Sequence, residues 1–330
     1  MTIRPQLWLP LCGALLIGTI PAAQAQNYPN RAISVVVPFA AGGLTDVPAR
    51  VFAAMFQDKV GQNVVVDNKT GGSGIIGATF VSRAAPDGYT LLANSIADAQ
   101  NLHFVTSPYH PIDDFSQVGW IVDGPPMALV VNAGLPYKTL AEMVADAKAN
   151  PQKLSFGTSG PASGPAMGVA LLNAAAGTSI VSVPYRGSGE AARAVTGGQI
   201  QGVFTFFSQA KPLVDDGKLR ALAVAAPKRL PEWPDVPTFQ ELGYKIDFRG
   251  FVGLAAPAKT PKRVIEYLNK QVNAVVQTDL FKKRMTDLGM SVPTAADNTP
   301  EKYEAYIREE IVKQGEIAKL MGVTKPEAPK

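Results

Sequence analysis

Hydrophobic residues along this chain follow two alternating patterns, short β-branched runs and longer stretches with helical spacing. Residues 33–37, Ile-Ser-Val-Val-Val, are typical of a buried parallel strand, and residues 47–60 carry apolar side chains at helical intervals. The alternation continues with a strand at 63–68, a helix at 75–84 and a strand at 89–94. This β-α-β-α-β order predicts a parallel sheet with right-handed crossover connections.

A second unit of similar design follows a looser stretch at residues 95–116 and two predicted strands near 117–122 and 128–132. A proline-rich connector at 227–237 ends this unit, because proline neither donates a main-chain hydrogen bond nor continues a helix. The predicted elements between them are a helix at 139–149, a strand at 154–157, a helix at 165–176, a strand at 180–184, a helix at 188–196, a strand at 200–206, a helix at 210–217 and a strand at 219–225.

The last part of the chain is predicted to return to the first unit through a strand at 248–255. The chain then crosses between the two units near residues 123–132 and 244–250, and a double crossing is how a hinged clamp is built. Three helices are expected after the returning strand, at 262–277, 279–288 and 300–321. The last helix has an apolar stripe suited to packing on the first unit, formed by Tyr303, Tyr306, Ile307, Ile311 and Ile317.

These patterns predict a two-lobed α/β protein, in which each lobe is a mixed, mostly parallel sheet flanked by helices. Lobe I is expected to comprise residues 26–125 and 248–330, and lobe II residues 126–247. The length agrees with this division, because about 305 residues after a leader exceed one comfortable hydrophobic core.

The first 25 residues have the layout of a secretory signal peptide, with Arg4, an apolar stretch at 7–20 and Ala-Gln-Ala at 23–25. We therefore expect an exported, soluble mature chain. The single cysteine, Cys12, lies inside this leader, so the mature chain is expected to have no disulfide or thiol chemistry. Removal of Arg4 lowers the formal net charge of +4 to about +3, and the basic residues are scattered. This distribution predicts no nucleic-acid partner.

Two glycine-rich turns carry the strongest functional signal. In the first, Gly42 and Gly43 stand between the first strand and the first helix, where the backbone can approach a ligand closely. The free amides and the dipole of a helix N-terminus favour an anion there. Residues 157–164 repeat this arrangement in the second unit. A purely structural turn is the alternative interpretation.

Motifs for other chemistry are weak. Residues 72–77 match G-x-G-x-x-G, but Asn94 closes the next strand where a dinucleotide site needs an acid. His103 and His110 share one loop region and have neither H-E-x-x-H spacing nor a cysteine partner, so surface or loop-packing roles are expected. We therefore predict no metal, no cofactor and no catalysis. A secreted serine hydrolase that uses Ser159 or Ser163 is a remaining alternative, although it lacks an evident base.

Two further positions in the second unit are candidate ligand contacts. Arg186 precedes a predicted helix and is able to form a bidentate pair with a carboxylate, although a structural ion pair is the alternative. Phe206 ends a predicted strand, where an aromatic ring either packs in the core or faces a ligand in the crevice.

Several segments together resemble one family, the Bug-type periplasmic solute-binding proteins of tripartite tricarboxylate transporters. After the signal peptide, the resemblance rests on the segments at 38–46, 68–74, 184–187, 217–224 and 236–239, which occur in the family's order. It covers essentially the whole mature chain. The resemblance implies a monomeric Venus-flytrap receptor in the periplasm that holds a small carboxylate between its lobes. It also implies delivery to a permease with one large and one small membrane subunit. A ligand sensor for a signalling kinase, which would share every feature of the site, is an alternative function.

The resemblance also implies a set of ligand-binding residues. The first lobe would give main-chain amides and ordered water to one carboxylate, and the second lobe would select the other end of the ligand. Asp46 is expected to bridge through water or to cap its helix, because an ionised carboxylate does not accept an anion. The implied residues are Phe39, Ala40, Ala41, Gly42, Gly43, Thr45, Asp46, Ser95, Ile96 and Ala97 in lobe I, and Ser159, Ser163, Gly164, Arg186, Gly187 and Phe206 in lobe II.

The chain departs from the family pattern at three positions that bear on the ligand. Members often have Asp-Asn where this chain has Thr205 and Phe206, and a histidine where it has Met167. A less charged site of this kind favours an aromatic or largely apolar carboxylate, such as a terephthalate-like acid, over citrate. Asp98 favours a more polar ligand instead, because it offers an acceptor for a ligand hydroxyl or amine. An aliphatic di- or tricarboxylate is the alternative ligand.

Overall fold

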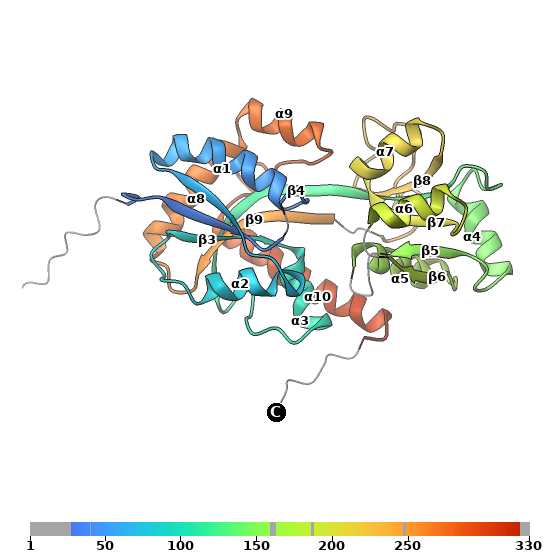
Figure 1. Cartoon of the computed structure of the whole chain (residues 1–330), viewed down its shortest axis with the longest axis horizontal. Coiled ribbons are helices and arrows are strands. Elements are labelled where there is room, and N and C mark those ends of the chain that lie inside the picture. Colours follow the sequence, from blue (N-terminus) through green and yellow to red (C-terminus); the bar gives the residue numbers. More distant parts are fainter. Residues whose placement is uncertain (1–27, 40, 159–162, 186–187, 247–248, 324–330) are drawn as a thin grey trace, which may run out of the picture.

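The computed structural model describes residues 28–323, except residues 40, 159–162, 186–187 and 247–248. The predicted signal peptide lies outside the described residues, as do four of the implied site residues, namely Ala40, Ser159, Arg186 and Gly187. Two α/β lobes make up the described chain, and the long strand β4 (Phe115–Asn132) runs from one into the other (Figure 1).

The sheet of lobe I combines parallel and antiparallel pairs in the order β2-β1-β3-β9-β4. β1 pairs in parallel with both β2 and β3, whereas β9 runs antiparallel to β3 and β4. These strands are β1 (Ile33–Val37), β2 (Val64–Asn68), β3 (Thr90–Ser95), β4 (Phe115–Asn132) and β9 (Arg249–Pro257).

The sheet of lobe II is built on the second half of β4. There β4 pairs antiparallel with β7 and with β8, and β5 lies between β7 and β6 in parallel. The lobe II strands are β5 (Ser155–Thr158), β6 (Val181–Pro184), β7 (Gly202–Phe206) and β8 (Leu219–Ala225).

The strand directions bring the carboxyl ends of the parallel strands in the two sheets face to face. β4 leads from lobe I into lobe II, and β1, β2 and β3 point the same way because both β3 and β4 are antiparallel to β9. In lobe II, β5, β6 and β7 point back, because β7 is antiparallel to β4. The carboxyl ends of the parallel strands of each lobe are therefore directed toward the other lobe, where ligands bind in open α/β sheets.

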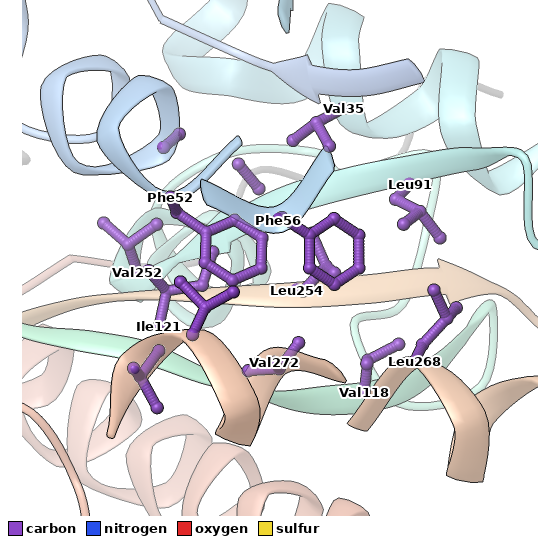
Figure 2. Packing of buried hydrophobic residues seen from close by; sticks show 14 of the residues in the cluster. Val35, Phe52, Phe56, Leu91, Val118, Ile121, Val252, Leu254, Leu268 and Val272 are labelled. Carbon is purple, nitrogen blue, oxygen red and sulfur yellow. The ribbon is translucent and has the colours of Figure 1, made fainter. Parts of the chain in front are cut away.

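Helices cover both faces of the lobe I sheet. Phe52 and Phe56 of α1 pack on one face together with Leu268 and Val272 of α8 (Figure 2). The alternation of strand side chains explains the two layers, because Val35 belongs to this core while its neighbours face the other side. The first face is covered by α1 (Asp46–Val60), α8 (Lys262–Val276) and α9 (Asp279–Asp287), and the second by α2 (Ile75–Ser82), α3 (Ile96–Phe104) and α10 (Pro300–Leu320).

Lobe II has the same layered design. One core contains Met143 and Leu172, and the other contains Val195 and Ala210. The first core lies under α4 (Leu140–Ala149) and α5 (Gly164–Ala176), and the second lies under α6 (Ser188–Thr196) and α7 (Phe207–Asp215). No helix in the described part of the chain is both long and apolar enough to cross a membrane.

The structure differs from the predicted elements in two places. Residues 96–104 form a helix inside the stretch that the pattern leaves as loop, because Ser95 and Asp98 close a capping box at its start. The two strands predicted around residues 117–132 are one continuous strand, β4. Its pairing with β9 shifts register between Asp123 and Pro126, where the consecutive prolines lack N–H donors for a regular ladder.

The last helix, α10, packs on both lobes. Tyr303 and Ile307 near its start are buried in lobe I beside Phe251, as the apolar stripe predicts. Ile317 near its end is buried in the core of lobe II, and Met321 packs against the same core. The prediction of packing on the first lobe is therefore right for the first half of the helix and wrong for the second.

Candidate functional site

Five helices begin where strand ends of the two lobes face one another. In lobe I, α1 and α3 follow β1 and β3; in lobe II, α5, α6 and α7 follow β5, β6 and β7. The first N–H groups of a helix lack main-chain partners, and the helix dipole makes this end positive. The helix starts of the two lobes therefore form a region in which both sides are suited to bind an anion.

The turn between β1 and α1 is held by the carboxylate of Asp46, which is 1% exposed. Its Oδ2 accepts hydrogen bonds from the Gly42 N–H at 2.8 Å and the Arg50 Nε at 2.8 Å, and its Oδ1 accepts from the Asn68 Nδ2 at 2.7 Å. Asn68 also donates to the carbonyl of Phe39 at 2.9 Å. The Asp46 carboxylate therefore braces the turn through protein groups, and its bridging to a ligand through water stays a prediction.

The hydrogen bonds also determine the charge of Asp46. Burial raises the pKa of this carboxyl, but the bonds from Arg50, Asn68 and the Gly42 N–H, together with the Arg50 charge, outweigh burial and lower its pKa. Asp46 is therefore ionised at neutral pH, and Arg50 lies 2.8 Å away to balance its charge. The turn is thus able to accept an anion even though it contains a carboxylate.

The glycines of this turn leave room above it. Gly42 has a φ of 77°, which side-chain-bearing residues rarely adopt, and a Cβ at this position would meet no heavy atom within 4 Å. Its N–H is already used by Asp46, so the predicted ligand contact of Gly42 cannot involve that donor without breaking the brace. Ala41 is exposed, Gly43 is half-buried and Thr45 is buried.

The glycines of the G-x-G-x-x-G segment have a packing role. A Cβ at Gly74 would lie 3.1 Å from the Phe39 Cζ, and one at Gly77 would lie 2.7 Å from the Lys69 carbonyl oxygen. These glycines let α2 and its preceding turn approach the β1–α1 turn closely. Phe39, which is half-buried, is thereby fixed against the second turn.

The turn between β3 and α3 is closed by internal hydrogen bonds. The Ser95 N–H donates to Asp98 Oδ2 at 2.8 Å, and the Ala97 N–H donates to Ser95 Oγ at 3.4 Å. Tyr109 donates its hydroxyl to Asp98 Oδ1 at 2.7 Å. Both oxygens of Asp98 therefore have protein donors, and the residue is only 4% exposed, which leaves little access for a ligand hydroxyl or amine. Ile96 lies between the two bonded amides and is half-buried.

On the lobe II side, Ser163 is the N-cap of α5. Its Oγ accepts a hydrogen bond from the Ala166 N–H at 3.4 Å, and Gly164 begins the helix. This capping orients the start of α5 toward lobe I and gives Ser163 a structural task beside the predicted ligand contact.

The three positions that depart from the family pattern differ in how deeply they are buried. Thr205 and Met167 are both 0% exposed. Thr205 donates its hydroxyl to Gln209 Oε1 at 2.8 Å, and the Met167 Sδ accepts from the Gln100 Nε2 at 3.3 Å. Phe206 is only half-buried, at the edge of the same lobe II core that Ile96 reaches from lobe I. Of these positions, Phe206 is therefore the one with ring surface left for a ligand.

Neither histidine lies at the facing helix starts. His103 lies in α3 with its Nε2 2.8 Å from the carbonyl oxygen of Ile311, and His110 Nδ1 accepts the N–H groups of Ile112 and Asp113. Across the described residues, no group of three or more His, Cys, Asp and Glu side chains is arranged to hold a metal ion.

Sequence reasoning missed Arg50, Asn68 and Gln100. Arg50 stands four residues after Asp46 on α1, a spacing that brings helical side chains together and was readable. Asn68 reaches Asp46 only because β2 pairs beside β1, and Gln100 lies on a helix that was not predicted.

Comparison with known proteins identifies the family. The model of the tripartite tricarboxylate transporter receptor family matches residues 48–323. The chain belongs to this family.

Three solved structures are similar to this receptor. MatC from Rhodopseudomonas palustris with bound malate is 31% identical, with a TM-score of 0.75, over 88% of this chain and 100% of that one. The periplasmic binding protein BugD is 33% identical, with a TM-score of 0.74, over 91% and 100%. Rpa4515 from R. palustris with adipate is 30% identical, with a TM-score of 0.78, over 91% and 100%.

Membership of this family fits the geometry of the facing helix starts. The receptor has the two-lobed periplasmic-binding-protein fold, and two of the similar structures hold carboxylates, malate in MatC and adipate in Rpa4515. The Bug-type resemblance in the sequence is thereby confirmed, and so is the fold that it implies.

Proposed function

We propose that this receptor binds a small dicarboxylate between its lobes, delivers it to the large and small membrane subunits of a permease, and catalyses no reaction. The observation that carries the proposal is the set of helix starts that face one another from the two lobes. Malate and adipate, the acids bound by two similar proteins, are both dicarboxylates, which supports this class of ligand. Main-chain amides at both ends suit a molecule with a charge at each end.

We place the receptor in the periplasm as a monomer, after removal of residues 1–25. Residues 26–125 and 248–330 form its lobe I, and residues 126–247 form lobe II. BugD, a similar structure, is a periplasmic binding protein, which supports this location.

One carboxylate of the ligand is assigned to lobe I. Because Gly42, Ser95 and Ala97 use their N–H groups inside the protein, we assign the carboxylate to the amides of Gly43 to Thr45 and of Ile96. The exposed Ala41 and the ring of Phe39 form the border of this subsite. Each charge-assisted bond contributes about 1.5 to 3 kcal/mol.

The other end of the ligand is assigned to lobe II, to Ser159, Ser163 and Gly164 before α5 and to Arg186 and Gly187 before α6. Phe206 and Ile96, which are both half-buried and pack against the same core, supply apolar surface between the two ends. This surface favours a ligand with an apolar middle, such as a terephthalate-like aromatic diacid. An aliphatic diacid is the second candidate, supported by the adipate of Rpa4515.

A serine hydrolase has little support in the geometry. The Ser163 Oγ caps α5, and the two histidines bond to main-chain groups of Ile311, Ile112 and Asp113. A sensor that passes its signal to a kinase would use the same ligand region, so it remains an alternative that differs only in the partner.

A thermal-shift screen tests the proposal. Aromatic and aliphatic mono-, di- and tricarboxylates are added to the mature receptor, and a ligand at 100 times its Kd should raise stability by about 2.7 kcal/mol. We expect diacids to give the largest shifts. A screen in which only monocarboxylates or only tricarboxylates stabilise the receptor, or in which no acid does, would contradict the proposal.

Replacement of Gly42 by valine then locates the site. The side chain would enter the empty space above the turn, so we expect at least about a tenfold loss of diacid affinity in calorimetry, equivalent to about 1.4 kcal/mol. Gly61→Val is the matched control, because Gly61 also has a positive φ and open space but lies at the far end of α1. Equal affinity in the two variants would refute the assignment of this turn.

A further inference from the structure

The lobes are joined by β4 and also touch through three helices, α3 and α10 of lobe I and α5 of lobe II. α10 is anchored in lobe I at its start, where the Tyr303 hydroxyl donates to Asn94 Oδ1 at 2.8 Å and the ring packs 5.0 Å from that of Trp120. Its other end is anchored in lobe II, where Ile317 is 2% exposed. In Figure 1, α10 runs along lobe I and ends beneath α5, and the two helices are in contact.

α3 is fastened to α10. The Nε2 of His103 lies 2.8 Å from the carbonyl oxygen of Ile311, and the imidazole occupies the space beside Gly315, where a Cβ would lie 2.9 Å from His103 Cε1. Phe104, at the end of α3, packs against the lobe II core. α3 and α10 therefore present one surface to lobe II.

One side-chain pair crosses from this surface to α5. The Gln100 Nε2 donates to the Met167 Sδ at 3.3 Å, and Met167 is fully buried. We call this contact, formed by Gln100, Phe104, Met167, Ile317 and Met321, the interlobe joint. Such a packed contact behaves as a fixed spacer, because protein interiors have low compressibility.

The joint lies close to two of the helix starts that are assigned to the ligand. Gln100 is four residues after Ile96, or about 6 Å along α3, and Met167 is three residues after Gly164, or about 4.5 Å along α5. Each start is therefore about one helical turn from the contact. A shift of either helix at the joint changes the distance between the two starts.

We propose that the interlobe joint sets the span of the ligand, and that Gln100 and Met167 are positioning residues that select the length of the diacid. This inference rests on the proposed function. A diacid that matches the distance between α3 and α5 engages both helix starts, whereas a shorter or longer one loses contact with one of them. Gln100 and Met167 act through the helix starts and do not touch the ligand.

Calorimetry with a series of unbranched diacids from succinate to suberate tests this inference on the mature receptor. Wild-type protein should prefer one length. Gln100→Ala removes the donor across the joint, and Met167→Leu keeps the volume but removes the sulfur acceptor. In both variants we expect the ratio of affinities between the best and the poorest diacid to fall by about tenfold, which corresponds to about 1.4 kcal/mol.

Gln57→Ala, an exposed glutamine on α1, is the matched control and should leave the ratio unchanged. Circular dichroism melting checks that each variant is folded. If the variants bind every diacid more weakly by one common factor, or if the ratio stays as in the wild type, the joint does not select length and the inference is wrong. If the wild-type receptor binds no diacid at all, the proposed function fails, and this inference fails with it.

Discussion

Asp46 and Asp98 make an informative pair, because both are buried acids near the start of a lobe I helix, yet their pKa values move in opposite directions. Asp46 is bonded by Arg50, Asn68 and the Gly42 N–H, and its pKa is lowered in spite of burial. Asp98, 4% exposed, has the Tyr109 hydroxyl and the Ser95 N–H as donors, and burial raises its pKa. The carboxylate with a cation among its donors has the lowered pKa, and the carboxylate with only neutral donors has the raised pKa, so the comparison singles out Arg50 as the group to test.

This difference has a consequence for anion binding. The pair of Asp46 and Arg50 adds little net charge to the β1–α1 turn, so its amides remain attractive to a carboxylate. Asp98 lies two residues after Ile96, and the donors to its carboxylate in the described part of the chain, the Ser95 N–H and the Tyr109 hydroxyl, carry no charge. We therefore expect the β1–α1 turn to contribute more to carboxylate affinity than the β3–α3 turn.

The largest predicted effect comes from removal of the Asp46 carboxylate. In Asp46→Ala, the Arg50 guanidinium loses its acceptor and the Gly42 N–H loses its brace, so the free energy of unfolding should fall by about 2 kcal/mol. Urea unfolding measures this loss. Glu304→Ala is the control, because Glu304 pairs with Arg308 on an exposed face and should change stability by about 0.5 kcal/mol or less.

If both alanine variants lose the same small amount, Asp46 does not brace the turn, and its contrast with Asp98 loses its structural basis. The diacid affinity of Asp46→Ala gives a second readout. We expect it to fall with stability, because the turn that holds the ligand loses its shape.

A second prediction concerns the pH dependence of stability, which should have opposite signs at the two acids. A lowered folded pKa means that Asp46 stabilises the protein above the ordinary aspartate pKa and that this contribution is lost as the pH falls through the folded pKa. A raised folded pKa means that Asp98 does not destabilise the protein below the ordinary aspartate pKa. As the pH rises from the ordinary pKa to the raised folded pKa, Asp98 lowers the free energy of unfolding.

Asparagine variants separate the two effects, since asparagine does not titrate. Relative to wild type, Asp46→Asn should lose stability as the pH rises from the lowered pKa to the ordinary one. Asp98→Asn should gain relative stability as the pH rises from the ordinary pKa to the raised one. Denaturant titrations at a series of pH values measure the two slopes. Slopes of the same sign would mean that the cation explanation of the comparison is wrong.

The two turns also show what sequence patterns reveal and what they leave open. The strand before Gly42 and the helix after it follow from hydrophobic periodicity, which is local. The capping box of Ser95 and Asp98 is equally local, and it would have predicted α3 if the weak apolar spacing of residues 96–104 had not hidden the helix. Patterns within about one turn of a residue are thus readable from the chain alone.

Contacts that depend on the relative position of distant elements were not readable. Asn68 reaches Asp46 because β2 pairs with β1, and the stripe of α10 does not say that Ile317 reaches the core of the other lobe. Met167 is a position where the family pattern bears on the ligand, but its place on α5 puts it in the core against Gln100. Long-range packing determined these positions, and no local signal accompanies it.

The smallest predicted effect addresses the cation directly. Arg50→Gln keeps a polar side chain but removes the charge next to Asp46, while the bonds from Asn68 and Gly42 to this carboxylate can persist. Because the Arg50 side chain is about half exposed, solvent screens the pair, and stability should fall by only about 0.5 to 1 kcal/mol. The pKa of Asp46, followed by NMR titration of its carboxyl carbon, should rise toward the ordinary aspartate value.

Lys283→Gln, which removes a cation from the exposed pair with Asp287, controls for the loss of one positive charge. A pKa of Asp46 that stays low in Arg50→Gln would show that the Asn68 and Gly42 donors suffice. The raised pKa of Asp98 would then have to come from its deeper burial and not from the lack of a cation.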